Sequence, residues 1–444
     1  MPLRSATRIL IPVLLPLLGN SCVHFREQPL SAEKGRADFA SRTMEDGGLQ
    51  AFLAQYGASS GNWDVNRLAL VAVYFHPDMA LARAEYDETT AGLQTARMRP
   101  NPVLTFSPQY ASYRAPVFTP WFIGGNAAFP IETAGKRSKR IAHSLALAEA
   151  ARWRVSARAW AARSRVRVGL LEVFSARENA RLLEAEQALH EDAIRKLAAQ
   201  MEAGDVSPFE LTQARLMLNR TRLALQDNRR NAATAQTRLA SALGLPFAAL
   251  GSVRLDFSSF HRLPLPTSAL RNALMGRADL MGLLAEYAAT EAALKLELSR
   301  QYPDINPTPG YDYNSGQNRW QIGVNFILPL NQNRGPIAEA VARRQTAEKR
   351  FLARQAAIQG ELDSARAAYD TSREKAATAA LLAGEAEHAA DTSQKMVEAG
   401  NISALELTRR RIEASAAKLA LLTAQIEAQT AAGLLEDAAQ SPFR

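Results

Sequence analysis

The sequence contains an internal repeat, and this repeat constrains the fold more than any other feature. His76 opens a helical stretch in the first repeat, and Arg277, 201 residues later, opens the matching stretch in the second. Gly204 and Gly400 occupy matching segments 196 residues apart, so the order of the motifs survives with a few deletions. Such self-similarity indicates a molecule built from two similar halves.

Each repeat is predicted to contain a helix, two strands, a long helix and a second helix. The opening helices are rich in Ala, Leu, Glu and Arg, and prolines follow them and stop them. The long helix of the first repeat, from about residue 133 to 203, would be on the order of 100 Å long. The predicted strands cover residues 102–113, 121–130, 303–313 and 319–329.

The two long helices are each predicted to turn back at a glycine and to continue in a capped partner helix. Ser207 and Glu210 have the spacing of a capping box after the first turn, and Ser403 and Glu406 repeat it after the second. Leucines and isoleucines recur at intervals of seven in both partner helices, as in coiled coils. The sequence therefore predicts two antiparallel helical hairpins with tips at the glycines.

The stretch from residue 320 to 329 alternates large apolar residues with small or polar ones. An extended chain of this kind has one apolar and one polar face, which is typical of a membrane barrel strand and also of half-buried strands in soluble sheets. In the first case Gln321 and Asn325 face the lumen. The residues that would face lipid are Trp320, Ile322, Val324, Phe326 and Leu328.

The remaining sequence bears on how such strands would cross a membrane. No segment after the N-terminal region approaches the roughly 20 apolar residues of a spanning helix. Strands can cross only as a closed barrel, because closure satisfies every backbone group in lipid. Two hairpins supply four strands, and the smallest barrels have about eight. We therefore expect several copies to assemble; the residues alone leave two, three or four copies open.

The N-terminal residues 1–21 are predicted to be a cleaved secretory signal. Arg4 and Arg8 precede an apolar run that ends in small and polar residues. Cys22, the only cysteine, follows where a bacterial lipoprotein would be acylated, with ordinary signal cleavage as the alternative. The segments expected after the signal are an N-terminal extension 22–63, a first repeat 64–244, a linker 245–266, a second repeat 267–437 and a disordered tail 438–444.

The net charge of +9 does not indicate a nucleic-acid partner. The basic residues are spread along helical patterns with interleaved Glu, as on a solvated helical surface. One exception is a basic cluster after the second strand, which would meet anionic lipid headgroups or simply begin a solvated helix. Its members are Lys136, Arg137, Lys139 and Arg140. Trp121 and Trp320 open matching strands and are candidates for an aromatic girdle.

Enzyme chemistry finds no support in the sequence. The six histidines are scattered without metal-ligand spacing, and there is no cysteine pair. No phosphate-binding loop or nucleophile elbow occurs. We predict a protein that is not an enzyme and has neither a cofactor nor a metal site.

The duplicated order of motifs resembles the TolC-type outer-membrane efflux channel family from about residue 64 to 438. The hairpin tips 204–211 and 400–407 and the segment 129–137, Phe-Pro-Ile-Glu-Thr-Ala-Gly-Lys-Arg, carry the resemblance. The last segment is most similar to the heavy-metal branch typified by CzcC and CusC.

The resemblance implies a mainly α fold with a small β part. Three chains, each giving four strands, would form a twelve-stranded barrel in the outer membrane of a Gram-negative bacterium, continued by a long α-helical coiled-coil barrel in the periplasm. The implied partners are further copies of the chain, outer-membrane lipid, a periplasmic membrane-fusion adaptor and an inner-membrane pump of the resistance-nodulation-division type.

The implied function is passive exit of substrates, here metal cations, delivered by the pump and the adaptor. A drug-efflux or type I secretion channel of the same architecture is the first alternative. A soluble periplasmic coiled-coil scaffold or adaptor, whose strands form a small sheet, is the second.

The resemblance also assigns roles to the hairpin tips. Glu406 would face the pore, where copies of an acidic residue form a ring that favours cations, although it is also a capping residue. Arg409, with Glu210 on the other hairpin, belongs to the same aperture, and Arg409 to Arg411 would pair across the hairpins or be solvated. The residues that would face the adaptor are Gly204, Asp205, Val206, Ser207, Gly400, Asn401, Ile402 and Ser403.

Overall fold

The computed structural model describes residues 25–58, 61–112, 120–251, 253–264, 276–314 and 316–442. The predicted signal and Cys22 lie outside these ranges. The chain divides into two compact units, Met1–Arg42 and Thr43–Arg444. In the first, helix α2 (Ala32–Ala40) begins after Ser31, whose hydroxyl accepts a hydrogen bond from the amide of Lys34.

The second unit contains the repeated elements. The order helix, strand, strand, long helix, helix occurs twice, with two short helices before the first repeat. The helices are α3 (Gly47–Gln55), α4 (Val65–Phe75), α5 (Pro77–Arg97), α6 (Lys136–Glu202), α7 (Pro208–Leu243), α9 (Ala278–Ser299), α10 (Arg334–Glu398) and α11 (Ala404–Ala439).

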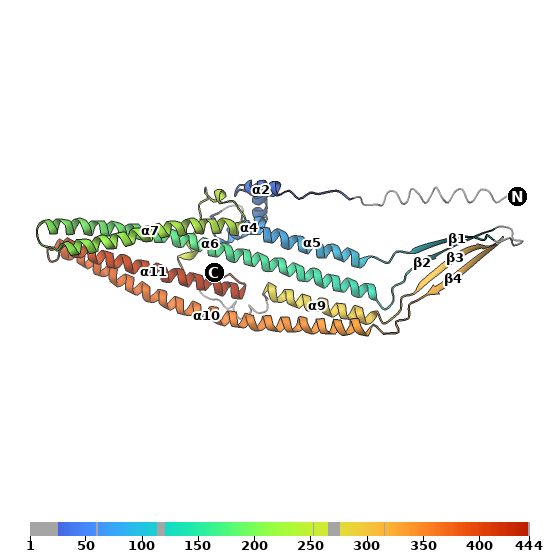
Figure 1. The fold of residues 1–444 in the computed structure, drawn as a ribbon. Coiled ribbons are helices and arrows are strands. Elements are labelled where there is room, and N and C mark those ends of the chain that lie inside the picture. The colour runs from blue at the N-terminus through green and yellow to red at the C-terminus, as the bar shows by residue number, and fades with distance from the viewer. Residues whose placement is uncertain are drawn as a thin grey trace. The chain divides into compact units, whose positions relative to one another are not determined.

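The long helices set the dimensions of this unit. Helix α6 has 67 residues and α10 has 65, so each is on the order of 100 Å long at about 1.5 Å per residue. Within Thr43–Arg444 the hairpin tips lie at one end of the helices and the four strands at the other (Figure 1). None of the described helices combines the length and the apolar composition needed to cross a membrane.

The main hydrophobic core lies where the first repeat begins. Leu49 and Leu53 of α3 and Leu68 of α4 are fully buried against Leu170 of α6 and Leu243 of α7. A second cluster joins α9, α10 and α11 around Leu280, Ile358, Tyr369 and Leu435. The stretch expected as a linker contributes to the first core, since it forms two short 3-10 helices, Phe247–Leu250 and Ser258–Phe260, and buries Phe260.

The four strands form one antiparallel sheet in the order β1-β2-β3-β4. All four occur where the sequence predicts them, but with shifted bounds: β1 and β2 end three and two residues early, β3 begins three residues late, and β4 ends at Asn325 instead of residue 329. The strands are β1 (Val103–Tyr110), β2 (Trp121–Ala128), β3 (Asn306–Asn314) and β4 (Gln317–Asn325).

The last helix extends into the stretch that the sequence predicts to be a disordered tail. Helix α11 continues through Ala439, and Ala438 and Ala439 are buried, so the tail expected from residue 438 starts inside a packed helix. Gln440 then accepts a hydrogen bond from the amide of Ala278 (2.8 Å), at the start of the second repeat. Alanine has high helix propensity, and its burial against neighbouring helices overrides the polar character of the segment.

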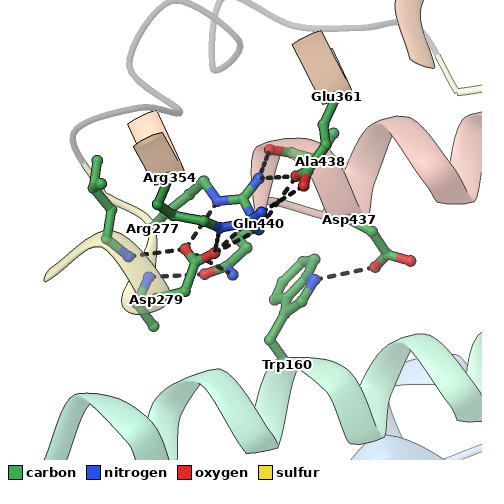
Figure 2. A network of polar contacts seen from close by, with 10 residues as sticks. Trp160, Arg277, Asp279, Arg354, Glu361, Asp437, Ala438 and Gln440 are labelled. Atoms are coloured by element: carbon green, nitrogen blue, oxygen red, sulfur yellow. Dashed lines mark hydrogen bonds and ion pairs between the residues drawn. The ribbon is translucent and has the colours of Figure 1, made fainter. Parts of the chain in front are cut away.

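A polar network surrounds this C-terminal contact (Figure 2). Arg277 pairs with Asp279 (2.8 Å) and Glu361 (3.3 Å) and donates to the carbonyl of Ala438. Arg354 of α10 also pairs with Asp279 (2.8 Å). Burial opposes ionisation of Asp279, but the two guanidinium groups prevail and lower its pKa. The network thereby fixes α9 to α10 and α11.

Candidate functional site

The strand register produces a sheet with two chemically different faces. Directly paired residues share a face, so one row across the sheet contains Phe106, Gly125, Tyr311 and Trp320. Every residue on this apolar face is aromatic or apolar except Asn318, beside the β3–β4 turn. Its members are Leu104, Phe106, Pro108, Tyr110, Trp121, Ile123, Gly125, Ala127, Pro307, Pro309, Tyr311, Tyr313, Asn318, Trp320, Ile322 and Val324.

The opposite face is mostly polar. It contains Gln321 and Asn325, as predicted from the alternation, together with Asp312 and Arg319. It also contains Thr105, Ser107, Gln109, Asn126, Asn306, Thr308, Asn314 and Gln317. A sheet that is apolar on one side and polar on the other suits a boundary between lipid and water.

The predicted row of lipid-facing residues is only partly within a strand. Trp320, Ile322 and Val324 lie on the apolar face, and these residues are 81, 83 and 55% exposed in the single chain. Phe326 and Leu328 come after the end of β4 and belong to no strand of this sheet. Residues beyond Asn325 have no partner strand to extend the ladder within the described chain.

Two aromatic pairs repeat at equivalent places in the two hairpins. The rings of Tyr110 and Trp121 are 5.0 Å apart, and those of Tyr311 and Trp320 are 4.9 Å apart. Both pairs lie directly across neighbouring strands on the apolar face. The duplication in sequence is thus a duplication of side-chain contacts, while a girdle role for the two tryptophans remains a prediction.

The basic cluster after β2 makes contacts within the chain that neither interpretation of the sequence anticipated, while Arg137, Lys139 and Arg140 stay half-exposed. Lys136 is buried and its ammonium group binds Asp304 and the carbonyl of Tyr302, each at 2.7 Å. Arg137 donates to the carbonyl of Arg97 (2.9 Å), at the end of α5.

The other two members of this cluster act in the same way. Lys139 donates to the carbonyl of Ala134 (2.8 Å). Arg140 donates to the carbonyls of Ala96 (3.1 Å) and Met98 (3.0 Å). The arginines thus satisfy carbonyl groups that the last turn of α5 leaves open. The spacing of the basic residues along the chain does not reveal these distant acceptors.

The tips of the two helical hairpins have the same backbone geometry. Gly204 and Gly400 have φ of +85° and +75°, a region that strongly favours glycine. In the first tip the amide of Asp205 donates to Gln200 and that of Gly204 to Met201; the second tip repeats both bonds, including Asn401 to Met396. This is the Schellman arrangement, which ends one helix and redirects the chain into the next.

The predicted capping boxes differ between the repeats. The hydroxyl of Ser403 accepts a hydrogen bond from the amide of Glu406 (3.1 Å), as predicted. Ser207 lies at the equivalent position with an extended backbone but makes no side-chain cap bond, so that half of the prediction is wrong. Pro208, directly after Ser207, fixes the backbone angle of the first helical residue and stabilises the helix start in its own way.

A polar clasp joins the two hairpins close to their tips. The ammonium group of Lys196 in α6 binds Asp192 (2.6 Å), the hydroxyl of Thr408 (2.7 Å) and the carbonyl of Ala404 (3.2 Å). Thr408 in α11 also donates to Asp192 (2.9 Å). The hydrogen bond from Lys196 is the largest influence on Asp192 and lowers its pKa, against the effect of burial. Sequence spacing does not reveal this clasp, because Thr408 lies more than two hundred residues from Asp192 and Lys196.

The charged residues that the resemblance assigns to the aperture also meet across the hairpins. Arg409 lies 3.3 Å from Glu210 in α7 and 3.9 Å from Glu406 in its own helix. Arg410 lies 3.1 Å from Glu406 as well. The acidic charge of Glu406 is therefore offset by two neighbouring arginines within one chain. These surface pairs contribute little stability individually, typically below about 1 kcal/mol.

Buried leucines next to the clasp also hold the two hairpins together. Leu197 of α6, Leu211 of α7 and Leu405 of α11 are buried together, with Val206 of the first tip packed against them. Val206 is therefore part of a small core, whereas Asp205, Ser207, Asn401 and Ser403 are exposed. Within the described ranges no group of three or more acidic, histidine or cysteine side chains is placed to hold a metal ion.

Comparison with known proteins agrees with this geometry. The family model described as outer membrane efflux protein matches residues 72–245 and 269–439, one match for each repeat. The chain belongs to the outer membrane efflux protein family. This membership makes it an outer-membrane protein with helices that extend into the periplasm, and a channel-type protein instead of an enzyme.

Among characterised relatives, the chain is 25% identical to the cobalt-zinc-cadmium resistance protein CzcC of Cupriavidus metallidurans over 335 residues. The alignment covers 74% of this chain and 78% of CzcC. The relative thus belongs to the heavy-metal branch that the sequence of segment 129–137 suggested.

Two solved structures show a similar fold. VceC of Vibrio cholerae matches with a TM-score of 0.69 at 17% identity, covering 86% of this chain and 97% of VceC. CusC, whose structures describe transmembrane channel formation, matches with a TM-score of 0.68 at 18% identity, covering 86% of this chain and 95% of CusC. The four-stranded sheet and the paired helical hairpins are therefore features of a shared fold.

Proposed function

We propose that the protein is the exit channel of a tripartite efflux system. Three copies would contribute twelve strands to a barrel in the outer membrane and six helical hairpins to a periplasmic tunnel. Substrates would pass through passively, delivered by an inner-membrane resistance-nodulation-division pump and a periplasmic adaptor that meets the hairpin tips. The observation that carries this proposal is the four-stranded sheet with one apolar and one mostly polar face, on a helical body of the efflux family.

Metal cations are the substrate class that we propose. The support is the relative CzcC, named for resistance to cobalt, zinc and cadmium, and the likeness of fold to CusC. The channel itself needs no metal ligands for this role, because a passive pore conducts hydrated ions and the pump selects them. Drug efflux or type I secretion through the same architecture is the alternative to be tested alongside.

A deletion strain tests the substrate class. We expect loss of the gene to lower tolerance to cobalt, zinc or cadmium, and the intact gene on a plasmid to restore it. Hydrophobic drugs serve as the matched comparison in the same strain. Unchanged metal tolerance together with increased drug sensitivity would contradict the metal assignment and favour drug efflux.

A further inference from the structure

The sheet has two edges, at β1 and β4, whose backbone groups have no partner strand in the described chain. The amide of Ala111 donates to Pro120 (2.8 Å), so the odd-numbered residues of β1 direct their backbone groups toward β2 and the even-numbered residues direct theirs outward. The amide of Phe129 donates to Pro307 (3.0 Å), which directs the odd-numbered residues of β3 toward β2. By the same alternation, even-numbered residues of β4 such as Val324 direct their backbone groups outward.

The internal repeat predicts how these two edges meet. Tyr311 follows Tyr110 by 201 residues and Trp320 follows Trp121 by 199, and each Tyr–Trp pair lies across its own hairpin. The seam between the hairpins, β2 against β3, is therefore a template for a seam between β4 of one chain and β1 of another.

We propose that β4 of one copy pairs antiparallel with β1 of the next copy in the register that sets Val324 opposite Tyr110. This register is the repeat-equivalent of the observed pair Gly125–Tyr311. It rests on the proposed function, because only an assembly of several copies brings these two edges together. Val324 and Tyr110 both belong to the apolar face, so the register continues that face from one chain to the next.

A proline at matching positions of β1 and β3 supports treating these two strands as equivalent. The continuous part of the β2–β3 ladder ends at Asn126–Gly310, because the next residue, Pro309, has no N–H to direct toward β2. Pairing resumes at Phe129, whose amide donates to Pro307. Pro108 occupies the equivalent position in β1, and its missing N–H points outward, so the ladder with β2 runs past it without interruption. At its free edge β1 therefore lacks an N–H donor at the same position as β3 does in its seam with β2.

The early end of β4 has the same explanation. The equivalent strand β2 continues to Ala128, since β1 pairs with it on its other side, whereas β4 has β3 alone and stops at Asn325. In the proposed register Leu328 lies opposite Phe106, equivalent to the observed bond from Phe129 to Pro307. Pairing between copies would therefore extend β4 and bring Phe326 and Leu328 onto the apolar face.

An ion pair distinguishes the two kinds of seam. The seam within the chain is closed at its helical end by Lys136 and Asp304. Each long helix begins after two residues with positive φ, so Arg334 is the equivalent of Lys136. Val103 lies at the position equivalent to Asp304 and has no charge with which to form an ion pair. At this point the seam between copies is therefore held by backbone pairing and apolar contacts. If β2 and β3 of one chain separated to pair with another copy, the ion pair between Lys136 and Asp304 would be lost.

Disulfide cross-linking in the intact outer membrane tests the register. Gln109→Cys combined with Asn325→Cys places two cysteines directly opposite in the proposed pairing, where Cβ atoms lie about 4.5–5.5 Å apart. Ser107→Cys with Asn325→Cys is slipped by two residues, and its Cβ atoms lie about 7–8 Å apart, beyond disulfide reach. Gly124→Cys with Asp312→Cys, across the internal seam, should link within one chain only.

We expect mild oxidation to convert most of the Gln109/Asn325 variant into covalent oligomers and to leave the slipped pair largely monomeric on denaturing gels. Each single variant controls for linkage through Cys22. Covalent oligomers from the slipped pair, or no linkage by either pair in a protein that still forms a heat-modifiable oligomer, would overturn the register and leave the channel proposal standing. A monomer that is released without detergent would contradict the channel proposal itself.

Discussion

At the scale of single residues, Gly244 shows how one side chain is excluded by backbone geometry. It ends α7 with φ of +73°, and a Cβ there would lie 2.8 Å from the Cα of His76 and from the carbonyl oxygen of Phe75. A left-handed backbone costs other residues about 1–2 kcal/mol, and overpacking typically adds about 1–3 kcal/mol. Gly244→Ala should therefore lower the thermal midpoint of the helical signal strongly.

Gly92→Ala is the matched control for this substitution. Gly92 lies inside α5, and a Cβ added there would meet nothing within 4 Å, so alanine should raise stability by up to about 1 kcal/mol through helix propensity. Equal midpoints for the two variants would show that the contact of Gly244 with His76 is not needed by the fold.

The clasp of Asp192, Lys196 and Thr408 gives the hairpin contact a dependence on pH. The pKa of Asp192 is lowered in the folded protein, so its contribution is complete above the ordinary carboxyl pKa and is lost as the pH falls through the lowered value. We expect channel openings in planar bilayers to become more frequent at acid pH for this reason. Asp192→Asn should show frequent openings already at neutral pH, with Asp205→Asn, at the exposed tip, as the control. A pH profile in which Asp192→Asn behaves like the natural protein would contradict this role of the clasp.

Glu406 tests the proposed pore ring. Its carboxylate lies near Arg409 and Arg410, so its removal changes the local charge from nearly balanced to positive. Glu406→Gln should lower the preference for cations, measured as the reversal potential under a salt gradient. Glu413→Gln, which removes another partner of Arg410, is the control. An unchanged reversal potential in Glu406→Gln would exclude the ring.

At the scale of elements, local sequence pattern predicts what depends on neighbours along the chain. The alternation of apolar and polar residues correctly predicts that Trp320, Ile322 and Val324 share one face. The glycines correctly predict the positions of both hairpin turns. The end of β4 was wrong by four residues, because strand length depends on a partner strand and not on the alternation. The carbonyl acceptors of Arg137 and Arg140 lie about forty positions away in the sequence. The charge of the two arginines therefore predicts only contact with lipid headgroups or water, and not these hydrogen bonds.

The two faces of β4 yield opposite expectations for an added charge. Val324→Asp places a carboxylate on the apolar face, at a depth-dependent cost of up to a few kcal/mol per strand in lipid, which is repeated in every copy. We expect it to prevent formation of the heat-modifiable oligomer in the outer-membrane fraction. Asn325→Asp places the same charge on the polar face and should assemble normally. Equal assembly of both variants would contradict the assigned orientation.

At the scale of the whole molecule, the repeat produces two similar halves, and the contacts that join them cannot be predicted from the sequence pattern. Arg167 of α6 is buried 3.4 Å from Glu436 of α11 and donates to the carbonyl of Gln429 (2.9 Å). Burial lowers the pKa of Arg167, and the paired Glu436 opposes that shift. A lone buried arginine would be destabilising, so the partners on α11 explain why this arginine of α6 can be buried.

Copies of this chain should form a conducting pore, and single-channel recording tests this most directly. Protein purified from the outer membrane in detergent and added to a planar lipid bilayer should give discrete conductance steps, which Val324→Asp abolishes and Asn325→Asp preserves. A protein that inserts as an oligomer without any conductance step, at neutral or acid pH, or that remains a detergent-independent soluble monomer, would contradict the account.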